Sequence, residues 1–189
     1  MNFVVGKMVG YAEANMELSR YDSAKLRFML EVIYLLVVQL SVYAAFFAAI
    51  GRLTEFAVAM GVLMSIRPFS GGLHFKKYRY CFVLSFAILA AVILVLPDIS
   101  NTFAMESLLV ATILLNIALS PVSKRNAAHS AKSNFIFKVV STVILLAYSA
   151  FLLTTRDNPY VSIVTWMLFI QSAQLIIGKM MLHARTKEQ

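Results

Sequence analysis

The chain has 189 residues, of which 60% are apolar and only 14% are charged, whereas a typical soluble domain carries roughly 25% charged residues. Its mean hydropathy is +0.79. A soluble fold of this size buries only about 70% of its unfolded surface, so much of this apolar excess would face water. These values exclude a soluble monomer, a nucleic-acid-binding domain and a disordered protein, and they predict a membrane protein.

The first 20 residues carry an amphipathic pattern. On a helical wheel Glu13, Glu17 and Arg20 lie opposite a broad apolar face formed by Val4, Val5, Met8, Val9, Ala12 and Met16. This pattern predicts a helix lying in the cytoplasmic interface of the membrane, although a helix packed on the bundle would show it equally well. Because polar residues interrupt the stretch, we expect no signal peptide here.

Six hydrophobic segments follow, at residues 28–50, 53–66, 80–96, 103–119, 135–153 and 160–182. About 20 residues are needed to cross a bilayer, so the second segment is short and could be re-entrant or tilted. Proline is expected to end that segment at Pro68. We therefore expect one all-α polytopic membrane domain over 1–189, with an interfacial helix at 1–20 and a transmembrane bundle at 28–182.

The net charge of +8 is informative once it is sorted by side. With six spans, only Arg52 and Arg156 fall on one side of the membrane. The other side holds the remaining basic residues: Lys7, Arg20, Lys25, Arg27, Arg67, Lys76, Lys77, Arg79, Lys124, Arg125, Lys132, Lys138, Lys179, Arg185 and Lys187. Cytoplasmic loops retain positive charge. The pattern predicts a multi-pass cell-membrane protein with both termini and the long loops 67–79 and 120–134 in the cytoplasm.

The first long loop holds the residues best suited to chemistry. It leads to the single cysteine, Cys81, and contains His74. A thiol of pKa about 8.5 is mostly protonated at neutral pH, and a neighbouring imidazole can remove that proton. The cations of the loop would favour the thiolate, although positive-inside topology alone also explains them. A lone cysteine at a helix end, by contrast, is usually a small hydrophobic residue.

Spacing constrains how this pair can meet. On one continuous helix the Cα atoms of His74 and Cys81 would lie roughly 10 Å apart, which is too far for a hydrogen bond. We therefore expect His74 in a loop or first turn that bends back over the start of the third span. Gly71 and Gly72 supply the backbone freedom for that bend.

The motif resembles the signature of the AgrB family (accessory gene regulator protein B), with Arg67, Gly71-Gly72, His74 and Cys81 at these spacings. Members of that family are membrane cysteine endopeptidases of Gram-positive peptide quorum sensing. The Ser-Pro-Val at 120–122 and the six-segment layout are also similar. The resemblance implies cleavage of an AgrD-like precursor peptide through an acyl-cysteine thioester, followed by thiolactone or lactone ring closure. It implies that Cys81 is the nucleophile and His74 the general base and later acid.

The resemblance also implies roles around this pair. Arg67, Ser70, Gly71 and Gly72 match or border motif positions that support the loop or contact the substrate. The precursor resembles a peptide with an amphipathic helix and an acidic tail, and a homodimer in the bilayer is expected. The cytoplasmic cations that could hold the acidic tail are Lys76, Lys77, Lys124, Arg125 and Lys132.

No third catalytic residue is evident from the sequence. Four polar residues expected near the cytoplasmic boundary are candidates to orient His74: Glu31, Asn116, Ser70 and Ser120. Glu31 and Asn116 are polar within spans, which is costly in lipid, but either could equally make a structural hydrogen bond between helices. Ser70 and the backbone of Gly71-Gly72 are candidate oxyanion donors.

Other function classes have weaker support. No Cys/His cluster has zinc spacing and no glycine-rich loop resembles a nucleotide site, so we expect neither a metal nor a cofactor, and no nucleic-acid partner. A small transporter or scaffold is the alternative, with Gln39, Asn116 and Gln171 lining a path and the Cys/His pair not catalytic. A membrane cysteine acyltransferase or a protease with another substrate is a further enzyme alternative.

Overall fold

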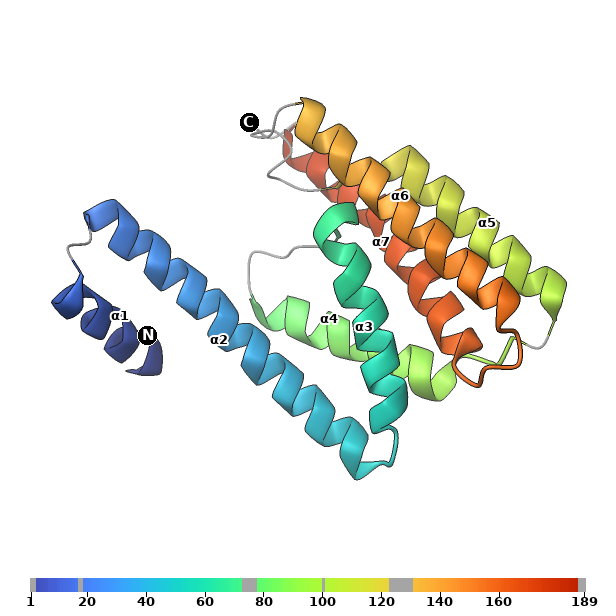
Figure 1. The fold of residues 1–189 in the computed structure, drawn as a ribbon, viewed down its shortest axis with the longest axis horizontal. Coiled ribbons are helices and arrows are strands. Elements are labelled where there is room, and N and C mark those ends of the chain that lie inside the picture. Colours follow the sequence, from blue (N-terminus) through green and yellow to red (C-terminus); the bar gives the residue numbers. More distant parts are fainter. Residues whose placement is uncertain (1–2, 17–18, 73–77, 100, 123–130, 187–189) are drawn as a thin grey trace. The chain divides into compact units, whose positions relative to one another are not determined.

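The computed structural model describes residues 3–16, 19–72, 78–99, 101–122 and 131–186. These residues form α1 (Phe3–Asn15), α2 (Arg20–Ala49), α3 (Leu53–Ser70), α4 (Tyr78–Ala90), the π-helical segment η1 (Ala91–Val95), α5 (Thr102–Leu119), α6 (Ala131–Thr154) and α7 (Val161–Thr186) (Figure 1). Within this part of the chain, five helices are long and apolar enough to cross a membrane: α2, α4 with η1, α5, α6 and α7. The prediction of an all-α polytopic membrane protein is confirmed.

The second hydrophobic segment forms α3, which is not one of those five helices. Our prediction that Pro68 ends this segment is wrong, because α3 continues through Pro68 to Ser70. Proline removes one N–H donor from the helical ladder, and here it does so only two residues before the helix ends. The end itself is set by Gly71, whose positive φ of 81° is a backbone conformation that glycine adopts and other residues rarely do.

The chain divides into two compact units: 1–51, called the N-terminal unit, and 52–189, called the C-terminal unit. In the N-terminal unit α1 packs on α2 and buries Val5 and Val9, whereas Val4 and Met8 of the predicted apolar face stay exposed. Ser19 caps α2 by accepting a hydrogen bond from the backbone N–H three residues later. The second helix therefore begins well before the apolar segment at 28–50.

The C-terminal unit is organised around α7. This helix contacts α3, α5, α6 and η1, and Figure 1 shows α5, α6 and α7 side by side. In α7, 56% of the most apolar stretch is buried, against at most 22% in α4 with η1, α5 and α6. Helix α7 contributes three fully buried side chains to the core of the unit: Met167, Leu168 and Leu175. The outer helices thus present apolar surface suited to lipid, while α7 forms the interior of the unit.

The connections of the C-terminal unit meet at two opposite ends. At one, called the bridge end, residues 70–72 pair with residues 120–122 through an isolated parallel β-bridge between Gly71 and Val122. At the other, called the short-loop end, the backbone N–H of Ile99 donates to the Ser162 hydroxyl over 2.9 Å. The two loops that the charge pattern groups together thus start from one end. Their cytoplasmic location stays a prediction.

Candidate active site

The bridge end is built first from the C-terminus of α3. Ser70, its last residue, is 1% exposed, and the following Gly71 donates its N–H to the Arg67 carbonyl oxygen over 3.0 Å. A Cβ placed on Gly71 would collide with the carbonyl group of Val122. Position 71 therefore requires glycine twice, for its positive φ and for the close approach of a second backbone.

That second backbone belongs to residues 120–122, which follow α5. The Val122 N–H donates to the Ser70 carbonyl oxygen over 3.0 Å, and the Gly72 N–H donates to the Val122 carbonyl oxygen over 3.3 Å. Two segments about fifty residues apart in sequence are thereby held in register, and the peptide bond between Ser120 and Pro121 is cis. The Ser-Pro-Val stretch noted in the sequence is thus part of the same structural element as the Gly71-Gly72 pair.

Helix α7 contributes the third side of this element. The Gln171 side-chain amide donates to the Gly71 carbonyl oxygen over 2.8 Å and to the Ser70 hydroxyl over 3.3 Å. Further along α7, a Cβ on Gly178 would lie 3.0 Å from a methyl carbon of Val122, so a small residue lets the bridge sit close to the helix. We call the assembly of Ser70, Gly71, Gly72, Val122 and Gln171 the bridge element.

A buried polar network joins α5 to α6 directly behind this element. Asn116 is fully buried, and its amide nitrogen donates to the hydroxyls of Ser141 and Thr142 over 3.1 and 3.2 Å. The hydroxyls of Ser120 and Ser141 lie 3.2 Å apart. Asn116 therefore makes the structural interhelical bond that was one of its two predicted roles. Its side-chain oxygen has no hydrogen-bond partner in the described part of the chain, and its role in orienting His74 stays a prediction.

The other predicted supporting residues have defined surroundings. Arg67 is half-buried, and its Nε lies 3.5 Å from where a Cβ on Gly72 would stand, so its side chain passes over that glycine. Glu31, in the N-terminal unit, pairs with Arg27 at 3.6 Å. The N–H groups of Gly71 and Gly72 are both bonded within the fold, so neither is a free oxyanion donor as suggested from the sequence.

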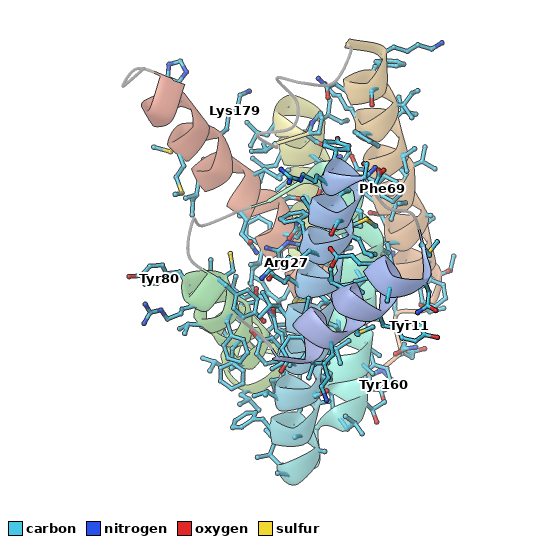
Figure 2. All side chains as sticks on the ribbon, turned by 90° about the vertical axis from the view of Figure 1, so that its left-hand side faces the viewer. Tyr11, Arg27, Phe69, Tyr80, Tyr160 and Lys179 are labelled. Atoms are coloured by element: carbon cyan, nitrogen blue, oxygen red, sulfur yellow. The ribbon has the colours of Figure 1, made fainter. Side chains whose placement is uncertain are left out.

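The predicted nucleophile lies on α4. Cys81 is the fourth residue of that helix and is half-buried. Nearby, the Tyr78 and Phe82 rings are 6.2 Å apart, and Tyr80 projects outward from the start of α4 (Figure 2). The thiol thus sits at the beginning of an apolar helix, with aromatic residues nearby.

Several predicted residues fall outside the described regions. His74, Lys76 and Lys77 lie between Gly72 and α4, and Lys124 and Arg125 follow Val122. Lys132 is described and is exposed in the first turn of α6. Among the described residues, no group of three His, Cys, Asp or Glu side chains has the arrangement of a metal site.

Comparison with known proteins places these residues in a family. The family model described as Accessory gene regulator B matches residues 5–175. The chain belongs to the AgrB family. A protein of Clostridium beijerinckii that is named as AgrB-like is 26% identical over 171 residues, which cover 88% of this chain and 83% of that protein. No solved structure matches the chain significantly.

Membership of the AgrB family implies involvement in the processing of agr quorum-sensing peptides, and together with the five apolar helices it indicates a multi-pass membrane protein. In this AgrB chain the signature residues Arg67, Gly71 and Gly72 lie in or beside the bridge element. The recognised motif therefore coincides with the turn that joins the end of α3 to residues 120–122 and to α7.

Sequence reasoning missed part of this site. Gln171 was noted only as a polar residue that could line a transport path, and Gly178 was not noted at all. A usable signal existed for Gln171, because an amide within an apolar span must find a hydrogen-bond partner or incur a large desolvation cost. Gly178 carried no such signal, since small residues are common wherever membrane helices pack closely.

Proposed function

We propose that this AgrB protein is a membrane cysteine endopeptidase that cleaves an AgrD-like precursor peptide on the C-terminal side of its ring-forming segment. The observation that carries the proposal is the spacing of Gly71-Gly72, His74 and Cys81 in a member of this family, with the glycine pair locked in the bridge element and Cys81 at the start of α4. A fixed turn two residues before His74 is what a loop needs in order to present an imidazole reproducibly.

The proposed reaction begins at the thiol. His74 takes the proton of Cys81, and the thiolate attacks the scissile carbonyl carbon of the precursor. The C–N bond breaks, His74 returns the proton to the departing amine, and the peptide stays on Cys81 as a thioester. A cysteine or serine inside the peptide then attacks that thioester, which releases the Cys81 thiol and closes a thiolactone or lactone ring.

Ring closure requires that water be kept from the acyl-enzyme. Exchange of one thioester for another is close to neutral in energy, so hydrolysis would otherwise compete. A half-buried thiol at the start of an apolar helix, with Tyr78 and Phe82 close by, suits this requirement. The basic residues of the two loops, Lys76, Lys77, Lys124, Arg125 and Lys132, are proposed to hold the acidic tail of the precursor on the cytoplasmic side, in an enzyme that acts as a homodimer.

The transporter alternative relied on three polar residues within spans. Each of them donates its amide N–H groups inside the fold: Gln39 to Tyr43, Asn116 to Ser141 and Thr142, and Gln171 to Ser70 and Gly71. Their polarity thus has a structural reason that does not involve a conducting path. A cysteine acyltransferase, or a protease with another substrate, is distinguished by the identity of the cleaved peptide.

The decisive experiment is coexpression with a precursor peptide encoded beside the gene, followed by mass spectrometry of the peptide products. We expect the Cys81→Ala and His74→Ala variants to abolish the cleaved fragment, and a covalent peptide adduct to form on Cys81 of the wild type. His183→Ala is the matched control, because His183 is exposed near the end of α7. Undiminished cleavage by the Cys81→Ala variant would exclude the proposed function.

A further inference from the structure

Gln171 is an unusual residue for its position. It lies in a helix apolar enough to span the membrane and is 2% exposed. An amide in such surroundings costs several kcal/mol when unpaired, by an order-of-magnitude estimate. Its nitrogen has two N–H donors, and the structure gives it two acceptors, the Gly71 carbonyl oxygen and the Ser70 hydroxyl. The donor capacity of this buried amide is therefore spent entirely on the turn that follows α3.

The turn needs a donor from outside its own backbone. Three of its main-chain groups are paired by neighbouring backbone: the Gly71 N–H, the Ser70 carbonyl and the Gly72 N–H. The Gly71 carbonyl takes no part in the backbone hydrogen bonds of the β-bridge, which join Val122 to Ser70 and to Gly72. The Gly71 carbonyl oxygen accepts instead from two side chains, the Gln171 amide at 2.8 Å and the Ser70 hydroxyl at 3.3 Å. Since the Ser70 bond is long, Gln171 is the principal partner of this carbonyl.

We infer that Gln171 is a positioning residue for the reaction: by holding the Gly71 carbonyl it fixes the direction in which the chain leaves α3 toward His74. The inference rests on the proposed function, in which His74 activates Cys81. Gly72 stands between the held carbonyl and the loop, with its own N–H bonded to Val122. The backbone is thus anchored on both sides two residues before His74.

Gln171 acts through the turn and not on the substrate. Both of its N–H groups are used inside the fold, and the side chain is closed off from solvent. Loss of its hydrogen bonds should therefore leave precursor binding intact and slow the chemical step, because a misplaced general base lowers kcat without changing uniform substrate binding.

The test uses the full-length protein in lipid nanodiscs with the precursor peptide. Gln171→Met keeps the length of the side chain and removes its donors. We expect kcat to fall about tenfold or more, with KM within about twofold of the wild type. Gln174→Met is the matched control, because Gln174 is also buried, on the same helix, and the change is chemically identical. It should keep kcat within about twofold.

A second measurement separates mispositioning from unfolding. Cys81 is the only cysteine, so the rate of alkylation by iodoacetamide at neutral pH reports on this thiol alone. Loss of a positioned imidazole should slow alkylation about fivefold or more, whereas unfolding would expose the thiol and accelerate it. Gln171→Asn keeps a buried amide but is one methylene shorter, and it should act in the same direction should Gln171→Met fail to fold.

The outcomes are distinguishable. Wild-type kcat and wild-type alkylation in a folded Gln171 variant, or an equal loss in Gln174→Met, would overturn the positioning role alone. Cleavage that persists in Cys81→Ala would instead overturn the proposed function on which the role rests. A fall in kcat at constant KM, with slowed alkylation and an unaffected Gln174→Met, would support the inference.

Discussion

The two ends of the C-terminal unit are held together in different ways. At the bridge end the contacts are main-chain hydrogen bonds and buried amides, centred on Gly71, Val122 and Gln171. At the short-loop end they lie nearer the surface: an exposed Glu106–Arg156 ion pair at 3.2 Å and the Trp166 indole N–H on the Pro97 carbonyl oxygen at 3.0 Å. The bridge end is therefore stabilised mainly by buried hydrogen bonds, and the short-loop end mainly by contacts near the surface.

This difference agrees with the functions that we propose for the two ends. Buried hydrogen bonds are stiff and specific, because breaking one leaves a polar group without water. Exposed ion pairs are screened by solvent and contribute little. A rigid turn beside the signature residues and a plain loop at the opposite end are what we expect if chemistry is confined to the bridge end. Three substitutions and one control variant test that contrast.

The largest effect is expected at Gly71. Replacing it with alanine puts a side chain at φ 81° and drives a Cβ into the Val122 carbonyl. We expect the free energy of unfolding to fall by more than about 3 kcal/mol. Cleavage of the precursor should fall at least about a hundredfold, since small displacements in an active site have effects of that size. Thermal unfolding in detergent and a peptide cleavage assay measure the two quantities.

Gly51 provides the control for backbone conformation alone. Its φ is 71°, yet a Cβ there would have no heavy atom within 4 Å. Gly51→Ala should therefore incur only the left-handed penalty of about 1–2 kcal/mol and retain cleavage. Equal losses in the two variants would mean that the close approach of Val122 contributes nothing, and the rigid bridge end would lose its main support.

A smaller effect is expected at Asn116. Asn116→Leu removes two buried donors, but the Ser141 and Thr142 hydroxyls keep their own bonds to the Lys138 carbonyl oxygen. Because no hydroxyl proton is stranded, we expect a loss of about 1–2 kcal/mol, in the range measured for interhelical hydrogen bonds in membranes. Cleavage should fall by less than about fivefold. A complete loss of activity in the folded variant would instead indicate that Asn116 orients His74 directly.

The smallest effect is expected at the short-loop end. Glu106→Gln removes a surface ion pair whose side chains are 46% and 48% exposed. Such pairs contribute at most about 1 kcal/mol, and added salt weakens them further. Melting temperatures in low and high salt, together with the cleavage assay, should show a small salt-dependent change in stability and unchanged activity. A strong loss of cleavage would contradict the assignment of chemistry to the bridge end.

Much of the architecture was predictable because the composition of a hydrophobic segment by itself shows that the segment avoids water. The segments 103–119 and 135–153 match α5 and α6 to within a few residues. The start of α2 was not predictable in this way, because its first turns are rich in polar residues and the helix there begins at a Ser19 cap instead of at an apolar segment. The continuation of α3 through Pro68 was missed for a related reason: one lost donor near a helix end is tolerable.

The residues of the candidate site likewise differ in how far the sequence alone could predict their roles. Cys81, His74 and the glycine pair were identified from spacing, since a motif is local in sequence. For Asn116 and Gln171 the sequence could state only that a buried amide needs a partner. Which partner each amide has depends on helices that meet only after folding: Asn116 bonds to α6, and Gln171 to residues a hundred positions earlier. No local pattern contains that information.

By itself, then, the sequence determined the solvent of this protein, the approximate positions of its helices, its family signature and the residues expected to perform chemistry. Only the tertiary structure decided that residues 120–122 pair with the Gly71 turn and that α7 anchors both. The physical reason is that burial and helix formation depend on composition over a short window. Hydrogen bonds between distant backbone segments depend instead on which surfaces the packed helices bring within about 3 Å of one another.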